Sequence, residues 1–175
     1  LNNFLKNKKY ILHLPYILPK LEIIKQKNQI KYSMIGLNYF LYKRENFKFN
    51  FRKNNYNRAL LTFGASDKYG KCIFTYKILS RVGKLHINLI VGPFFKKKIK
   101  SEINKINPKN FLTISTFKKS LSYFFNKVDF IITNSGLSKY ESILTDKPVM
   151  VVYENKKIWN LNKGFINKKI SYNLP

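Results

Sequence analysis

The chain has 175 residues, of which 45% are hydrophobic and 16% aromatic, and its formal net charge is +26 at pH 7. This length suits a single domain that can bury a core, and the hydrophobic content excludes a chain that is disordered throughout. No apolar run reaches the roughly 18 residues of a membrane-spanning helix, and the charge indicates attraction to polyanions without identifying a site.

Residues 1–56 show no regular alternation of strands and helices. The apolar stretch 10–18 is broken by Pro15 and followed by Pro19, residues 32–35 are compatible with a strand, and residues 37–44 fit a helical turn or an extended linker. We interpret residues 1–56 as the remnant of a preceding domain and an interdomain linker. A start without methionine or a signal-peptide pattern leads us to expect a domain taken from a longer protein.

From residue 57 the pattern becomes regular. Strands are predicted at residues 59–63, 86–91, 111–115, 129–133 and 149–153. Helices are predicted at residues 72–82, 95–106, 118–126, 138–144 and 156–166, the first of them ending near Gly83. Apolar strands alternating with helices are typical of a parallel sheet covered on both faces. We therefore predict an α/β fold for residues 57–175, a Rossmann-like parallel sheet with helices on both faces.

The first predicted strand ends in the turn Gly64-Ala65-Ser66-Asp67. In an open parallel sheet, ligands bind beyond the carboxyl ends of the strands, where turns present backbone N–H groups. Small residues let the backbone approach a phosphate, and the Ser66 hydroxyl can donate a hydrogen bond to it. Such turns are common, so the motif alone indicates only a candidate phosphate contact.

The fourth predicted strand leads into the turn that contains Ser135, Gly136, Ser138 and Glu141. Gly136 permits a tight turn, and Ser135 and Ser138 have side chains that can cap the following helix. Glu141 can complete a capping box with Ser138, three residues earlier. Alternatively, it can accept hydrogen bonds from both hydroxyls of a ribose while the turn faces a diphosphate. The spacing leaves both roles open.

The fifth predicted strand is followed by Glu154, Asn155 and Lys156. Polar side chains at this point can reach the same cleft and contact a sugar or a base. The alternative is an ordinary solvated loop.

Cys72 is the only cysteine, and His13 and His86 are the only histidines. One cysteine excludes an internal disulfide and a cysteine-based zinc site, and two distant histidines give a metal site little to build on. We expect Cys72 to be a packed thiol rather than a nucleophile. We also expect no metal, no cofactor and a reducing, cytoplasmic location.

Lysine supplies 30 of the 34 basic residues. The lysines are spread along the chain, and together with Asn, Ile, Phe and Tyr they are what an A+T-rich genome encodes. Proteins that read nucleic acids favour the bidentate contacts of arginine. We therefore predict no specific nucleic-acid partner and no transmembrane segment, and we leave peripheral contact with a membrane open.

The segments LLTFGASD, DFIITNSGLSKYESILTDKPVMVV and YENK, in this order, resemble the C-terminal domain of a family of UDP-sugar hydrolases. The family is that of the UDP-2,4-diacetamido-2,4,6-trideoxy-β-L-altropyranose hydrolases of pseudaminic acid biosynthesis. It is related to spore-coat polysaccharide proteins and to the glycosyltransferase family 28 enzymes that add the N-acetylglucosamine of lipid II. The segment IGLNYFLYKREN is similar to the family's linker, and the resemblance covers roughly residues 32–166.

The resemblance implies the C-terminal half of a two-domain fold of the GT-B type and assigns residues to the substrate. Those expected at the nucleotide and its diphosphate are Gly64, Ser66, Ser135, Gly136, Ser138 and Glu141. Glu141 among them matches the glutamate that holds the ribose hydroxyls. Asn155 and Lys156 match the Asn and Gln of a segment close to the sugar. The sequence departs from the family pattern at Ala65 and Ser135, where the family has glycine, and at Lys156.

The function implied is that of the UDP-sugar-binding half of a hydrolase that acts at the anomeric carbon and releases UDP. The family's catalytic histidine lies in the N-terminal domain, so we expect no catalytic residue in this segment and no activity from it alone. His13 is not expected to take that role. The alternatives are one half of a GT-B glycosyltransferase and a non-catalytic module that binds nucleotides or polyanions.

Overall fold

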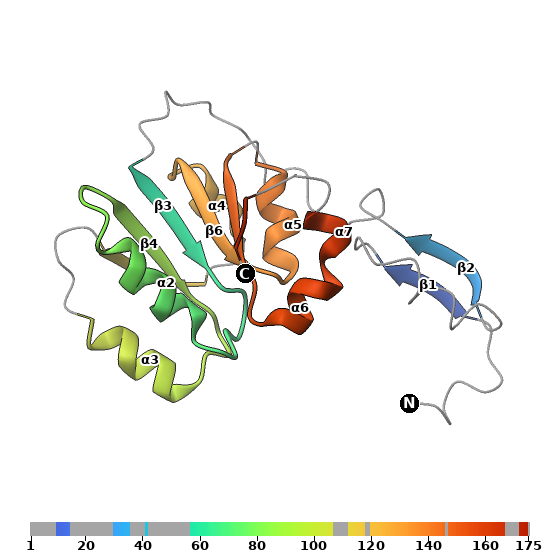
Figure 1. Cartoon of the computed structure of the whole chain (residues 1–175), viewed down its shortest axis with the longest axis horizontal. Coiled ribbons are helices and arrows are strands. Elements are labelled where there is room, and N and C mark those ends of the chain that lie inside the picture. The colour runs from blue at the N-terminus through green and yellow to red at the C-terminus, as the bar shows by residue number, and fades with distance from the viewer. Residues whose placement is uncertain are drawn as a thin grey trace.

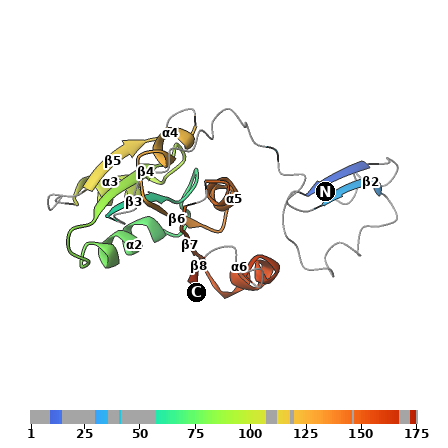
Figure 2. The same ribbon diagram turned by 90° about the horizontal axis from the view of Figure 1, so that it is seen from above.

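The computed structural model describes residues 10–14, 30–35, 41, 57–106, 112–117, 120–145, 147–166 and 172–174. The main element of this structure is a six-stranded sheet in which all neighbouring strands are parallel. Its strands are β3 (Arg58–Thr62), β4 (His86–Val91), β5 (Leu112–Thr116), β6 (Phe130–Asn134), β7 (Val149–Val152) and β8 (Tyr172–Leu174). They lie in the order β5-β4-β3-β6-β7-β8 (Figure 1 and Figure 2).

The chain begins this sheet in its middle, at β3. It builds outward through β4 to β5, then returns to the other side of β3 and continues through β6 and β7 to β8. This is the strand order of doubly wound nucleotide-binding folds. Because parallel crossovers are right-handed, the two halves place their helices on opposite faces. The strand order therefore reverses between β3 and β6.

Helices cover both faces of the sheet (Figure 1 and Figure 2). One face carries α2 (Lys71–Leu79) and α3 (Lys97–Asn104), and the other carries α4 (Ser122–Phe125), α5 (Leu137–Ile143), α6 (Lys156–Leu161) and α7 (Lys163–Ile166). Neighbouring strand residues separate accordingly, since Leu61 packs in the core under α2 and α3 and Leu60 in the core under α5 and α7. Side chains alternate along a strand, so apolar strands supply both cores.

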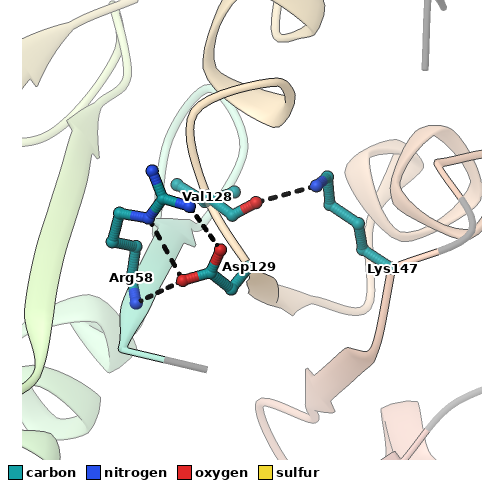
Figure 3. A network of polar contacts seen from close by, with 4 residues as sticks. All are labelled: Arg58, Val128, Asp129 and Lys147. Atoms are coloured by element: carbon teal, nitrogen blue, oxygen red, sulfur yellow. Dashed lines mark hydrogen bonds and ion pairs between the residues drawn. The ribbon is translucent and has the colours of Figure 1, made fainter. Parts of the chain in front are cut away.

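The amino ends of β3 and β6 are joined by an ion pair between Arg58 and Asp129 (Figure 3). Arg58 Nη2 and Nε lie 2.6 Å and 3.1 Å from the two carboxylate oxygens, and the backbone N–H of Arg58 donates to the same carboxylate at 3.0 Å. Burial of Asp129 opposes its charge, but the hydrogen bonds and charge of Arg58 outweigh this and lower the pKa of the carboxyl group. Nearby, Lys147 Nζ lies 2.8 Å from the carbonyl oxygen of Val128.

The predicted α/β class and the five predicted strands are confirmed. The majority of the strand ends differ from the prediction by one residue. β8 is a sixth strand that the sequence does not predict. It has three residues and pairs with β7 through Met150↔Tyr172 and the two following positions. So short a segment carries no periodicity of its own, and its neighbour in the sheet decides its conformation.

Three local expectations are corrected. β5 is not a buried strand, because it lies at the edge of the sheet and its Thr113 and Ile114 are exposed. The helix predicted at 156–166 divides into α6 and α7 at Asn162, whose Nδ2 donates to the carbonyl oxygen of Ile158. The helix expected to end near Gly83 ends at Leu79 instead.

A separate two-stranded parallel sheet is formed by β1 (Tyr10–Leu14) and β2 (Ile30–Ile35). The strand predicted at 32–35 is confirmed, and β1 ends immediately before Pro15, the first of the residues that interrupt the apolar stretch 10–18. Of the linker expected at 37–44, all but Leu41 lies outside the described residues. The domain boundary at residue 57 stays a prediction.

Replacing Arg58 with methionine tests how far its ion pair stabilises the sheet. The change leaves a carboxylate that is 2% exposed without its cation, so we expect the free energy of unfolding at pH 7 to fall by about 2 kcal/mol. Because the pKa of Asp129 is lowered in the folded protein, the stabilisation is complete above the ordinary carboxyl pKa and disappears as the pH falls through the lowered value.

Urea unfolding from pH 7 down to about pH 2 measures this difference. Arg81→Met is the matched control, because Arg81 is exposed. A loss for Arg58→Met that is no larger than the control's, or that persists at the acid end, contradicts the assignment.

Candidate functional site

The candidate site lies at the carboxyl edge of the sheet, where the strand order reverses between β3 and β6. Gly64, in the turn after β3, has a φ of +66°, a left-handed conformation that favours glycine. A Cβ atom placed on Gly64 would lie 3.7 Å from the Asn134 side chain and 3.8 Å from the Ser138 hydroxyl. The fold therefore brings together the two turns that the sequence selects separately.

The Asn134 carboxamide connects these two turns. Its Nδ2 donates to the carbonyl oxygen of Phe63 over 3.1 Å, and its Oδ1 accepts the backbone N–H of Gly136 over 3.3 Å. One half of the amide thus reaches across to the end of β3, and the other half holds its own turn. The sequence places Asn134 in a turn, but the bridge depends on which strand lies beside β6.

Asp67 links the first turn to the start of α2. Its carboxylate is buried and accepts the N–H groups of Lys71 at 2.9 Å and Cys72 at 3.0 Å, at the start of α2. A carboxylate in this position satisfies unpaired amides and is favoured by the helix dipole. These amides are therefore occupied, and Ser66, which is exposed, lies on the solvent side of the turn.

The turn after β4 packs directly against the first turn. The backbone N–H of Phe94 donates to the carbonyl oxygen of Ala65 over 2.9 Å. A Cβ atom on Gly92 would lie 2.4 Å from the Gly64 oxygen and 2.5 Å from the Ala65 oxygen, which is too close for any side chain. Gly92 therefore sets the position of the first turn. The sequence identifies a Gly-Pro turn here, but the contact itself is visible only in the fold.

The second turn begins α5 without a capping box. Gly136 is the N-cap residue, α5 begins at Leu137, and no side chain caps the helix. The capping-box alternative for Ser138 and Glu141 is therefore wrong, as is a capping role for Ser135. Glu141 is half-buried, and desolvation raises its pKa. Because capping does not use this carboxylate, the ribose role stays a prediction.

Ser135 and Glu154 link the second turn to the segment after β7. The Ser135 hydroxyl donates to Glu154 Oε2 over 2.6 Å. The predicted polar segment 154–156 therefore meets the second turn at the same edge of the sheet. Asn155 caps α6, with its Oδ1 accepting the N–H of Ile158 over 3.0 Å. Asn155 and Lys156 are exposed. The oxygen of Asn155 thus serves the helix, and its Nδ2 and the Lys156 ammonium are the groups suited to a sugar contact.

Lys139 is a buried charge that the sequence does not single out. It is 1% exposed, its Nζ donates to Asn162 Oδ1, and it lies 4.7 Å from the ring centroids of Tyr140 and Phe165. Desolvation lowers its pKa to about 8, while the charge of Glu154 acts in the opposite direction. No local signal separates Lys139 from the many exposed lysines, because α7 packing over α5 decides its burial.

Cys72 is fully buried in the core, which confirms the expected packed thiol, and this burial raises the pKa of the thiol. In the part of the chain that the structure describes, no group of three or more His, Cys, Asp or Glu residues could hold a metal ion. No helix in the same part is long and apolar enough to cross a bilayer.

Comparison with known proteins places the fold. No protein-family model matches the chain. The chain is similar to the uncharacterized protein MJ1062 of Methanocaldococcus jannaschii, with 24% identity over 129 residues that cover 72% of this chain and 26% of that protein.

Two solved structures resemble the chain over 95% of its length. They are the glycotransferase of kitacinnamycin, with a TM-score of 0.57, 12% identity and 42% of that chain covered, and TarM, with a TM-score of 0.59, 14% identity and 33% of that chain covered. This chain thus spans less than half the length of each of these three proteins. At this low identity the likeness shows the fold alone, which is a Rossmann-like α/β domain.

Gly92→Ala tests the contact between the first and third turns. The added methyl group meets two backbone oxygens, so we expect the free energy of unfolding to fall by about 2 kcal/mol. Gly83→Ala is the control, because a Cβ atom there has no heavy atom within 4 Å. Urea unfolding compares the two variants, and equal losses would exclude the close approach at Gly92.

Lys139→Met tests the cost of the buried ammonium group. The pKa of Lys139 is lowered to about 8 in the folded protein, whereas an unfolded lysine titrates near about 10.4. The unfolded state therefore binds more protons between these values, and the wild type gains stability as the pH rises through this window, on the order of 2–3 kcal/mol.

We expect Lys139→Met to lose this gain. Urea unfolding between about pH 7 and pH 10.5 measures it, and Lys127→Met, at an exposed lysine, is the matched control. If Lys139→Met keeps the pH slope of the wild type, Lys139 does not titrate in this window.

Proposed function

We propose that the chain is the nucleotide-sugar-binding domain of a GT-B-type enzyme and that its ligand is a UDP-sugar. The observation that carries the proposal is the meeting of two turns at the reversal point of the strand order, with Gly64 beside Asn134 and Ser138. Doubly wound sheets bind nucleotides at this point, because two crossovers open there into one crevice. The resemblance of both turns to the UDP-sugar hydrolase family supports a sugar nucleotide.

In this proposal the diphosphate lies over the two turns. Ser66 is exposed on the first turn, and the Ser138 hydroxyl of the second lies within 4 Å of the space that a side chain at Gly64 would occupy. Hydroxyl and backbone N–H groups are suitable donors to phosphate oxygens. Ser135 donates to Glu154, so we assign it to the positioning of Glu154. The net positive charge of the chain favours the approach of an anionic ligand.

Glu141 is the proposed ribose ligand. A carboxylate can accept a hydrogen bond from each hydroxyl of the diol with its two oxygens. The desolvation that raises the pKa of Glu141 is a cost that two such hydrogen bonds offset when the nucleotide is bound. Asn155 Nδ2 and Lys156, after β7, are proposed to reach the sugar.

In this proposal the domain stabilises UDP as a leaving group. Cleavage at the anomeric carbon transfers the bonding electrons to the diphosphate oxygen. Hydrogen bonds donated to that oxygen are stronger in the transition state, where its negative charge develops, than in the substrate. The attacking group and its base belong to the other domain of the GT-B pair. Hydrolysis, in which water attacks, is the reaction that the motif resemblance favours, within nonulosonic (pseudaminic) acid or surface polysaccharide biosynthesis.

Glycosyl transfer is the second candidate. It uses the same half of the enzyme for the same leaving group, with an acceptor hydroxyl in place of water. The observation that favours it is the fold likeness to a protein that is described as the glycotransferase of kitacinnamycin.

Isothermal titration calorimetry of the chain with UDP tests the proposal. We expect binding by the wild type, weaker binding of UMP because it lacks the second phosphate, and a loss of about tenfold in UDP affinity for Glu141→Gln. Glu102→Gln is the matched control, because it removes the same charge from an exposed position on α3.

The outcomes separate the parts of the proposal. A wild type that binds neither UDP nor UMP removes the nucleotide as ligand and leaves a non-catalytic module. Equal affinities for Glu141→Gln and Glu102→Gln keep the nucleotide but exclude the ribose role of Glu141.

A further inference from the structure

A mostly apolar groove lies between α3 and the edge of the sheet. Its volume is about 410 Å³, and its lining includes Ile103 of α3, Ile114 of β5 and Phe117 immediately after β5. Ile114 is 41% exposed and Phe117 47% exposed. The groove thus presents apolar side chains to solvent along the edge strand.

Phe94 continues this apolar surface beyond the groove. It follows Pro93, which lines the groove, and it is 74% exposed. The backbone N–H of Phe117 donates to the carbonyl oxygen of Val91 over 3.1 Å, which holds the turns after β4 and β5 next to each other. Several large apolar side chains exposed on adjacent turns are typical of a surface that binds a partner.

Lysines border the same surface. Residues 96–105 contain five lysines and one glutamate. α3 turns Ile99 and Ile103 to the core, so its charged side chains face outward. Lys100 stands at the groove, with its Nζ 3.4 Å from the carbonyl oxygen of Pro93. We call this the lysine–aromatic surface, defined by the exposed residues Phe94, Lys96, Lys97, Lys98, Ile114 and Phe117.

We propose that the lysine–aromatic surface docks the protein onto the headgroup region of an anionic phospholipid bilayer. Aromatic side chains insert at the boundary between headgroups and acyl chains, and nearby lysines bind the anionic headgroups. The charge of the surface complements such a bilayer. A nucleic acid would use the lysines and the two phenylalanines, but it gives no role to Ile114 or to an apolar groove.

The proposed docking would bring the candidate site to the membrane. Phe94 is bonded through its backbone to Ala65, in the turn that carries Gly64 and Ser66. The bilayer surface would therefore lie beside the candidate site at the carboxyl edge of the sheet. This inference stands on the surface alone and does not depend on the nature of the nucleotide ligand.

Co-sedimentation of the whole chain with lipid vesicles tests the inference. One set of vesicles is pure phosphatidylcholine, and the other contains phosphatidylglycerol at about one part in three. We expect at least about tenfold stronger partition onto the anionic vesicles. We expect the triple change Lys96→Ser, Lys97→Ser, Lys98→Ser to lower that partition at least about tenfold. The double change Phe94→Ser, Phe117→Ser should lower it at least about fivefold at unchanged net charge.

Two matched controls come from the opposite face of the sheet. The triple change Lys127→Ser, Lys157→Ser, Lys163→Ser removes the same charge from exposed positions, and Tyr123→Ser removes an aromatic ring that is 48% exposed. Unfolding curves verify that each variant is folded. All the replaced side chains are exposed, so we expect native stability.

Three results overturn the proposal. The first is a wild type that does not prefer anionic vesicles, and the second is a loss with the control lysines as large as that with Lys96–Lys98. The third is binding to single-stranded DNA that depends on Phe94 and Phe117 while vesicle binding does not. The proposal is supported if vesicle binding falls with the triple lysine change and with the double phenylalanine change on the lysine–aromatic surface, and with neither control.

Discussion

The pairing of β3 with β6 is the constraint on which the candidate site depends. The two strands come from distant parts of the chain, and they are fastened at both ends between residues that are 71 positions apart in sequence. At the amino ends Arg58 and Asp129 form an ion pair, and at the carboxyl ends Asn134 reaches the carbonyl oxygen of Phe63. Because a slip of one residue would turn each side chain to the other face, this register is tightly specified. It is what sets Gly64 beside Ser138.

Buried polar groups hold the segments that surround the site. Asp67 holds the start of α2, and Lys139 joins α5 to Asn162 at the start of α7. Burying such groups is costly unless partners satisfy them. Here the partners are backbone amides, a side-chain amide and aromatic rings. These buried contacts therefore position the turns. In the function that we propose, Ser66 and Glu141 are then available to bind a ligand.

The high lysine content is interpreted differently once the lysines are located in the structure. Along the sequence, lysines are spread evenly enough to be explained by codon usage. In the structure, those of residues 96–98 are exposed and follow the exposed Phe94 closely in the chain, whereas Lys139 is fully enclosed. Identical residues thus serve as a solvated surface, a proposed membrane contact and a buried link, and burial and neighbours decide which.

The sequence by itself determined the α/β class, the five longer strands and the two turns of the candidate site. Apolar runs and Gly-Ser turns are local, so each is readable within a few residues. Only the tertiary structure decided the edge strand β8, the exposure of β5, the bridge of Asn134, the contact at Gly92 and the burial of Lys139. Each of these depends on a neighbour distant in the chain. The capping box of Ser138 and Glu141 was open for a related reason, because its spacing fits two geometries and only the start of α5 at Leu137 separates them. Local propensities determine which segments become helices and strands, but packing between distant segments determines which elements become neighbours. A site made of two turns therefore forms only once its two strands are paired.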